Sequence, residues 1–389
     1  MAVKTINYLR KLFRDYYARS ARKLVLPEDF YAREFAAQLW GMKSYVRHLS
    51  FSSRGTFEQW VVDKAPRHLY YSSAVYKHPA AQNMDEKGWV GADLIFDIDA
   101  DHLPKCQSSI VEVVDEKVGV KASFAPAECV REAAWEAVKL FDVLVYELGF
   151  DKSRVYIEFS GHRGFHVTVR CKEIVECFEA DSQVRKEILD YVRAESFDEQ
   201  RVMQHVDSEV GRGRKRVKLF ELPPSIRDAG VRGRIARIIR RMALRRGDSV
   251  VVRIVSSEPL EAAALYRRNR ELFEEYLSIA FSEIRVEVDP QVTVDTKRLI
   301  RIPYSLHGKT GLPVIPLDVN RVDKFELSDD LSPFKRLGDV RVRALVSTPT
   351  IEVLSQRLKL EAGEEYKLPA PVAVYLLCKE VAVLAGETG

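Results

Sequence analysis

Residues 93–103, DLIFDIDADHL, place four aspartates within and beside a short apolar run. The apolar run predicts a buried strand, where carboxylates need a partner. Asp97 and Asp99 are separated by one residue, so on a strand both side chains project from the same face. Two carboxylates held so close repel each other, and a divalent Mg²⁺ or Mn²⁺ ion relieves the repulsion because it prefers oxygen ligands. The alternative is an acidic pair at a strand end that binds nothing.

The length and composition are those of a folded, soluble protein. The 389 residues allow two or three domains, or one large core with insertions, and 46% are hydrophobic and 30% charged. The longest apolar runs, such as 371–378, are too short to span a bilayer, and the charged N-terminus lacks the apolar core of a signal peptide. We therefore expect a cytoplasmic protein without a membrane segment.

The five cysteines are too few and too scattered to predict a disulfide framework. The chain has no C-x-x-C pair, which removes the strongest sequence signal for a zinc site.

Positive charge is concentrated in one block. The net charge is only +4, yet residues 212–246 contain thirteen Lys and Arg against two acidic residues. Such a block suits a polyanion such as nucleic acid. The alternatives are a solvated basic helix face or a surface that docks a partner.

The periodicity predicts a mixture of helices and strands. We expect two helices in the first forty-odd residues, hairpin strands over 45–71, a helix over 129–150 and a strand–turn–strand unit over 154–170. Residues 181–280 are expected to form a mostly helical insertion, strands resume at 283–294, and an apolar helix starts at 370.

The segment SGHRGFH, residues 160–166, has the composition of a phosphate-binding hairpin. Gly161 and Gly164 permit tight backbone geometry and close approach of an anion. Further donors come from the side chains on the same turn, which are Ser160, His162, Arg163 and His166. The alternative is a plain hairpin turn whose basic side chains face solvent.

A third cluster lies in VDPQVTVDTKRLIRIPYSLHGKTG, residues 288–311. Asp289 and Asp295 are candidate metal ligands, and the candidate phosphate donors are Arg298, Arg301, His307 and Lys309. A metal-bound triphosphate needs this combination of carboxylates and fixed cations. Neither a Walker A sequence nor a kinase-type glycine loop is present, which argues against the common ATP-binding folds.

These three segments, in this order, resemble the catalytic (small) subunit of archaeal and eukaryotic DNA primases. The resemblance covers roughly residues 40–315 and implies a mixed α/β (α+β) fold, a primase-type catalytic domain around twisted mixed sheets with a helical insertion. It divides the chain into a first catalytic part (1–180), the basic helical insertion (181–280), a second catalytic part (281–345) and a C-terminal tail (346–389).

The resemblance also assigns roles to residues. The metal-binding triad falls on Asp97, Asp99 and Asp289, the last chosen over Asp295 because it stands ten residues before Leu299. The roles of Asp101 and Asp295 stay open. The nucleotide- and phosphate-binding residues would be Ser160, Gly161, His162, Arg163, His166, Arg301, His307, Lys309 and, from the short match VRHLSF, Arg47. His162 stands where an arginine is usual in the family.

The chain departs from the family where a small zinc site usually follows the acidic strand. Only His102, Cys106 and Cys129 are available there, so a tetrahedral zinc would need a fourth ligand. The alternative is a remnant of the site with two free cysteines and no zinc, which is the expectation we adopt.

The implied activity is two-metal nucleotidyl transfer that starts short RNA primers, or DNA primers, on a single-stranded DNA template. The cofactors would be two Mg²⁺ or Mn²⁺ ions, the substrates nucleoside triphosphates, and the partner the large primase subunit. Two alternatives stay open: a repair-type primase-polymerase that mainly extends primers, and a nucleic-acid-binding subunit without activity.

Overall fold

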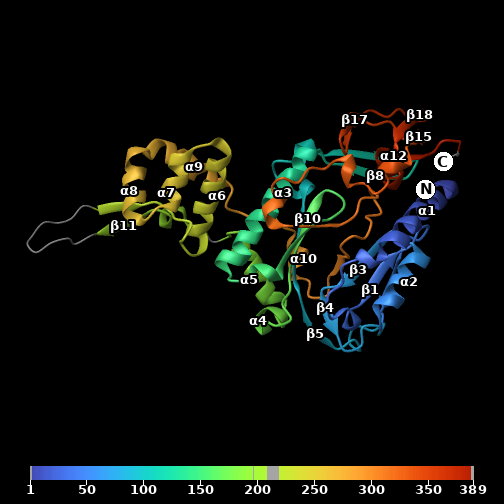
Figure 1. Ribbon diagram of the computed structural model, residues 1–389, viewed down its shortest axis with the longest axis horizontal. Helices are drawn as coiled ribbons and strands as arrows, with labels where there is room; N and C mark the ends of the chain where they lie inside the picture. The colour runs from blue at the N-terminus through green and yellow to red at the C-terminus, as the bar shows by residue number, and fades with distance from the viewer. Residues whose placement is uncertain (1, 196, 208–218, 387–389) are drawn as a thin grey trace, which may run out of the picture. The chain divides into compact units, whose positions relative to one another are not determined.

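The computed structural model of the protein describes residues 2–195, 197–207 and 219–386 (Figure 1). The chain divides into two compact units. The first contains Met1–Val138, Tyr156–Arg185 and Val288–Gly389, and the second contains Lys139–Val155 and Lys186–Glu287. All three segments that carry the family resemblance lie in the first unit.

One antiparallel sheet of the first unit has the strand order β13–β3–β1–β2. Its strands are β1 (Phe35–Gln38), β2 (Tyr45–Leu49), β3 (His68–Ser72) and β13 (Leu299–Arg301). Helices α1 (Val3–Ser20) and α2 (Arg54–Lys64) pack together, and in Figure 1 they lie beside this sheet. The rings of Phe51 and Phe57 each lie 5.2 Å from that of the fully buried Phe35. The register places Arg301 opposite Tyr70, which brings a C-terminal motif onto an N-terminal sheet.

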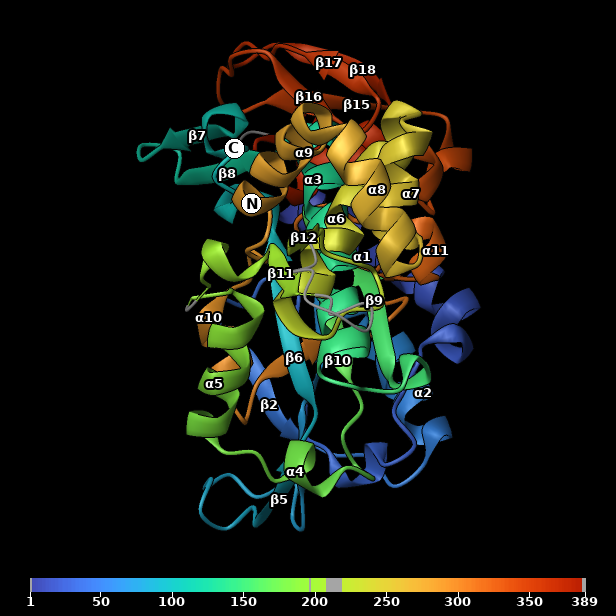
Figure 2. The same cartoon turned by 90° about the vertical axis from the view of Figure 1, so that its left-hand side faces the viewer.

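The second sheet carries the acidic strand and the glycine turn. Its order is β14–β9–β10–β6, formed by β6 (Leu94–Asp99), β9 (Val155–Phe159), β10 (Gly164–Val169) and β14 (Ile315–Leu317). Figure 2 shows β6, β10 and β9 side by side. The expected strand–turn–strand unit is therefore confirmed, and the turn between β9 and β10 lies at the end of β6 that carries Asp99.

Smaller elements complete the first unit. The pairs of strands are β4 (Ala74–Tyr76) with β5 (Trp89–Ala92), β7 (Val111–Asp115) with β8 (Val120–Phe124), and β16 (Ile351–Val353) with β17 (Gln356–Leu358). A C-terminal sheet contains β15 (Asp339–Ala344), β18 (Glu365–Pro369) and β19 (Ala382–Leu384). The short helices are α4 (Val175–Phe178), α10 (Pro290–Val294) and α11 (Val319–Val322). Helix α12 (Ala370–Cys378), expected from residue 370, is buried at every position and packs on β15 and α1.

Helices dominate the second unit. Helix α3 (Ala127–Asp142) ends there and continues into a π-helical turn, Val143–Glu147, and most of α5 (Ser182–Val192) belongs to it. The remaining elements are β11 (Gln204–Asp207), β12 (Leu219–Leu222), α6 (Gly230–Arg246), α7 (Ser249–Ser256), α8 (Pro259–Arg268) and α9 (Arg270–Ser282). The core of this unit is built on Ile235, Ile239, Phe273 and Tyr276, all fully buried. No helix in the described ranges is long and apolar enough to cross a membrane.

Internal ion pairs neutralise much of the basic helix α6. Arg234 and Arg237 each lie 2.9 Å from a carboxylate oxygen of Glu147, which is fully buried. Arg241 pairs with Asp142 at 2.8 Å. The first part of the basic block, residues 212–218, lies outside the described residues. Arg234, Arg237 and Arg241 of α6 are therefore paired with carboxylates of the same unit and are not free to bind a polyanion.

Three local expectations are wrong. The second helix expected before residue 40 is strand β1. Residues 54–64, expected as a hairpin strand, form α2 because the Ser53 hydroxyl accepts a hydrogen bond from the Thr56 N–H (3.2 Å) and caps the helix. No strand forms over 283–294: residues 283–289 are irregular and 290–294 form helix α10, where Pro290 occupies the first turn and the Asp289 carboxylate accepts from the Gln291 N–H (2.8 Å).

Candidate active site

Strand β6 presents Asp97 and Asp99 on one face, and Ile98 between them is fully buried. The register of β6 with β10 places His166 opposite Asp97 and Gly164 opposite Asp99. A Cβ atom on Gly164 would lie 2.0 Å from the carbonyl oxygen of Ile98, so only glycine fits there. The glycine turn is thereby held directly against the acidic strand.

Asp289 reaches the same place from almost two hundred residues away. Its backbone N–H donates to the carbonyl oxygen of Asp97 (2.9 Å), and its carboxylate caps α10. Asp97 is therefore the common neighbour of Asp99 and Asp289. Asp295, by contrast, is exposed, and its carboxylate accepts from the backbone N–H of Lys297 (2.8 Å).

The electrostatics of the acidic strand are unfavourable in the absence of a cation. Burial, and next the neighbouring Asp289 carboxylate, raises the pKa of Asp97 to about 6. Burial, and next Asp97, raises the pKa of Asp99 to about 6. His166 lies 3.7 Å from Asp97, but burial and then Arg301 lower the pKa of His166 to about 4, so it is neutral at pH 7. Among the described residues, Asp97 therefore has no charged partner within ion-pair distance, and Asp99 has only Arg163, at 3.9 Å.

The carboxylates suit a divalent cation. The Oδ1 atom of Asp97 is buried and has no hydrogen-bond partner among the described residues. Carboxylate oxygens are the ligands that Mg²⁺ and Mn²⁺ prefer. Within the described ranges no three His, Cys, Asp or Glu side chains already converge as a complete metal site. The three aspartates instead form two neighbouring pairs that share Asp97, so a cation would draw them together.

The glycine turn is built to hold one conformation. The hydroxyl of Ser160 accepts from the backbone N–H groups of His162 (3.4 Å) and Gly164 (3.3 Å). Gly161 has a φ of +79°, and a Cβ atom there would lie 2.9 Å from the Cβ of His307. The turn thus needs both glycines and packs against the segment that contains His307.

Arg163 lies between the turn and the acidic strand. Its guanidinium is 2.5 Å from the carboxylate of Asp101 and 3.9 Å from that of Asp99, and it also donates to the Ser123 hydroxyl. Asp101, whose role the sequence left open, is therefore the closest ionic partner of Arg163.

Arg301, His307 and Lys309 form a second basic segment. The Arg301 guanidinium lies 2.7 Å from Nδ1 of His68 and 4.8 Å from the centre of the Tyr70 ring. Burial, followed by Arg301, holds the pKa of His307 well below its usual value. Burial, followed by Arg163, lowers the pKa of the Lys309 ammonium. Cations from two separate segments thus crowd one another beside the acidic strand.

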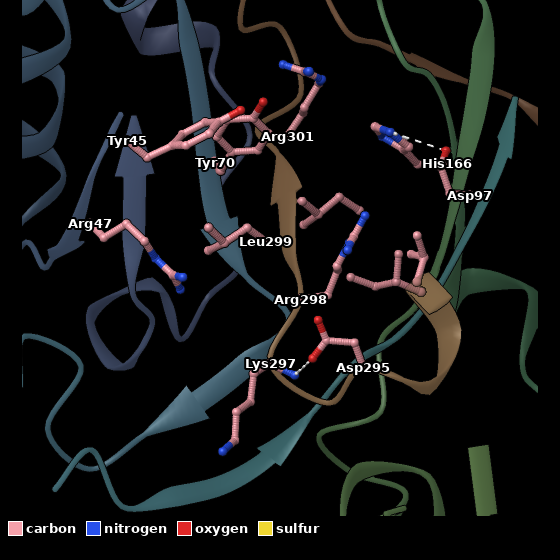
Figure 3. A pocket seen from close by; sticks show the side chains of 13 residues that line it. Tyr45, Arg47, Tyr70, Asp97, His166, Asp295, Lys297, Arg298, Leu299 and Arg301 are labelled. Atoms are coloured by element: carbon pink, nitrogen blue, oxygen red, sulfur yellow. Dashed lines mark hydrogen bonds and ion pairs between the residues drawn. The ribbon is translucent and has the colours of Figure 1, made fainter. Parts of the chain in front are cut away.

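A pocket of about 440 Å³ opens beside Asp97 (Figure 3). Of the candidates named from the sequence it brings together Asp97, His166, Arg301, Arg47, Arg298 and Asp295. The exposed Arg47 is oriented by the buried carboxylate of Glu34, 3.0 Å away. The other residues predicted from sequence do not line this pocket, and they are Asp99, Asp289, Ser160, Gly161, His162, Arg163, His307 and Lys309.

The pocket also contains residues for which sequence reasoning gave no role. Tyr45 and Tyr70 form an aromatic wall with ring centroids 5.7 Å apart, and Lys297 adds positive charge (Figure 3). For the tyrosines no sequence signal existed, because the pairing of β3 with β13 brings Tyr70 to Arg301.

The cysteines correct two expectations. Cys106 and Cys129 are joined in a disulfide across 23 residues, and Cys171 is joined to Cys177. The expectations of scattered cysteines without disulfides and of two free cysteines beside His102 are therefore wrong. In this state neither Cys106 nor Cys129 offers a thiolate to zinc. The spacing of the cysteines along the chain could not show that Cys129, at the start of α3, lies next to Cys106 in the fold.

Comparison with known proteins agrees with these motifs. Residues 96–319 match the family model described as DNA primase small subunit. The chain is 50% identical to a protein named DNA primase small subunit PriS from Hyperthermus butylicus, over 98% of each chain. Proteins of the same name from Saccharolobus islandicus and Methanococcoides burtonii are 35% and 32% identical, covering 96% and 98% of this chain and 94% and 99% of their own. The resemblance predicted from three short segments is confirmed: the chain belongs to the DNA primase small subunit family.

Proposed function

We propose that this chain is the catalytic subunit of a DNA primase, a nucleotidyltransferase that starts short RNA or DNA primers on single-stranded DNA. The observation that carries the proposal is the meeting of Asp97 and Asp99 on β6, which repel each other, with crowded cations from two other segments. A metal-bound triphosphate would relieve both, because its metal needs carboxylates and its phosphates need cations.

Asp97, Asp99 and Asp289 would hold two Mg²⁺ or Mn²⁺ ions. When bound, these ions supply a lowered pKa at the attacking 3′-hydroxyl and neutralise charge on the leaving pyrophosphate. The protein's own cations, above all Arg301, Lys309 and Arg163, would bind and orient the phosphate oxygens. The neutral His166 can donate a hydrogen bond to an oxygen without repelling the metals.

The aromatic wall and Arg47 would bound the part of the substrate farther from the phosphates. A tyrosine ring offers a flat apolar face and a hydroxyl, which suits a nucleoside. The family description "small subunit" supports a larger subunit as the partner, and the template would be single-stranded DNA.

The test is primer synthesis by the purified full chain, with and without its large subunit, from free nucleoside triphosphates on single-stranded DNA. Asp97→Asn should lower incorporation by about a thousandfold or more, because the ligand shared by both ions is lost. Asp85→Asn, an exposed loop aspartate, is the matched control and should leave synthesis unchanged. Unchanged synthesis by Asp97→Asn would refute the proposal. Extension of added primers without any dinucleotide from free triphosphates would favour a primer-extending polymerase instead.

A further inference from the structure

Lys379, the residue directly after the buried helix α12, contacts the glycine turn between β9 and β10. Its ammonium donates to the backbone carbonyl of Ser123 (2.6 Å). The same nitrogen lies 2.6 Å from Nε2 of His162, in the middle of the turn. Lys379 is 6% exposed, and burial, followed by Arg163, holds the pKa of Lys379 well below its usual value. Burying a lysine in this way is costly, so the contact calls for a reason.

The contact partner is a neutral histidine. Burial, followed by Lys379 itself, holds the pKa of His162 well below its usual value. Nε2 of the neutral ring and Nζ of Lys379 share one hydrogen bond, whichever of the two nitrogens donates. Lys379 therefore fixes the orientation of His162.

His162 begins a row of rings that joins the two basic segments. Its ring stacks on that of His307, with centroids 4.9 Å apart and planes 14° apart. His307 meets His68 edge-on at 5.0 Å, and Nδ1 of His68 is 2.7 Å from the Arg301 guanidinium. The row runs from Lys379 through three imidazoles to Arg301, across both segments proposed to bind phosphate.

We infer that Lys379 is a positioning residue for the triphosphate, acting through His162. The inference rests on the proposed function. The contact joins the C-terminal segment to the glycine turn, so Lys379 would hold the His162 ring, and the row of rings that starts from it, in one orientation. Lys379 lies beyond residues 96–319, the part matched by the family model, so neither that match nor the sequence motifs point to it.

Lys379→Met tests the inference by two readouts on the full chain: the KM for ATP in primer synthesis, and the Kd for ATP with Mn²⁺ by calorimetry. Both should rise about tenfold, because the hydrogen bond that orients His162 is lost, while kcat changes less. Lys367→Met is the matched control, an exposed lysine paired with Asp339, and should change neither. If the methionine variant does not fold, Lys379→Gln, which can still donate to Ser123, takes its place with the same expectation.

The second variant separates positioning from simple core packing. In His162→Arg/Lys379→Met a guanidinium on the turn itself can meet the phosphates without the Lys379 contact, so KM and Kd should recover to within about threefold of the parent. Values that stay as high as in Lys379→Met, with the thermal midpoint restored, would overturn the inference, as would an unchanged Kd in Lys379→Met. A parent that makes no primers but binds ATP with a Lys379-dependent Kd would instead overturn the proposed function alone.

Discussion

Two regions of this protein concentrate charge, and they differ in how that charge is compensated. In the second unit, the arginines of α6 meet acidic partners, and the buried Glu147 alone holds both Arg234 and Arg237. In the first unit, Asp97 and Asp99 have raised pKa values, and the nearest basic neighbour of Asp97 is the neutral His166. Closely paired charge of the first kind stabilises a fold, whereas crowded like charge of the second kind, with Arg163 at 3.9 Å from Asp99 as its ion-pair partner, marks a candidate ligand site.

The largest effect on stability should come from the paired region. Glu147→Gln leaves Arg234 buried without its counter-charge, and the free energy of unfolding should fall by about 3–5 kcal/mol. Glu275→Gln breaks an exposed pair with Arg246 and should cost no more than about 0.5 kcal/mol. Thermal or denaturant unfolding of the two variants measures the difference, and equal losses would contradict the distinction between buried and exposed pairs.

Beside the acidic strand of the first unit, neutralising a charged side chain should weaken substrate binding rather than lower stability. Arg301→Gln should raise the KM for nucleoside triphosphate about a hundredfold, because a charge-assisted phosphate contact is lost. Removing one of several crowded cations should leave the thermal midpoint unchanged or higher. Steady-state kinetics beside thermal unfolding checks both, and a large loss of stability with an unchanged KM would show that Arg301 is structural.

The acidic strand predicts an unusual dependence of stability on pH. The folded pKa values of Asp97 and Asp99, about 6, lie above the usual value, so their protonation stabilises the fold. This stabilisation is complete at low pH, below the unfolded pKa, and is lost as pH rises through about 6. Without metal, Asp97→Asn should therefore be about 1–2 kcal/mol more stable than the parent at pH 7.5, with little difference near pH 4. Unfolding at both pH values in the presence of a chelator is the measurement, and a destabilised variant at pH 7.5 would contradict the account.

The affinity for metal should change with pH in the opposite direction to the stability of the metal-free protein. Because both carboxylates must be ionised to hold a cation, Mn²⁺ affinity should fall steeply as pH drops below about 6. An affinity that does not change between pH 7.5 and pH 5.5 would place the metal on other ligands.

The smallest effect concerns Asp101. It holds Arg163 at 2.5 Å and would compete with phosphate for the guanidinium. Asp101→Asn should lower the KM for triphosphate about threefold, the size of one partly exposed ion pair. A loss of activity as deep as that of Asp97→Asn would instead make Asp101 a metal ligand.

The sequence predicted the features that depend on local pattern. Alternation placed Asp97 and Asp99 on one face, and the glycines of the turn marked the hairpin that the structure contains. The mixed α/β fold and the family were also predicted correctly. Short capped segments were less predictable: residues 54–64 form a helix that starts at the Ser53 cap, where the sequence predicted a strand.

Long-range neighbours could not be read from the chain. Tyr70 lines the pocket only because β3 pairs with β13. Lys379 contacts the glycine turn only because the helix before it, α12, packs in the core. The Cys106–Cys129 pair depends in the same way on where α3 begins in space. Whether Asp97, Asp99 and Asp289 hold metal stays a prediction.

Binding of Mn²⁺ in the presence of ATP, measured at pH 7.5 on the parent and on Asp97→Asn, tests the central claim most directly. The account predicts that the parent binds Mn²⁺ with ATP, that the variant loses this binding, and that the variant remains folded and more stable without metal. Equal binding of Mn²⁺ by the two proteins would show that the carboxylates of β6 do not bind the metal.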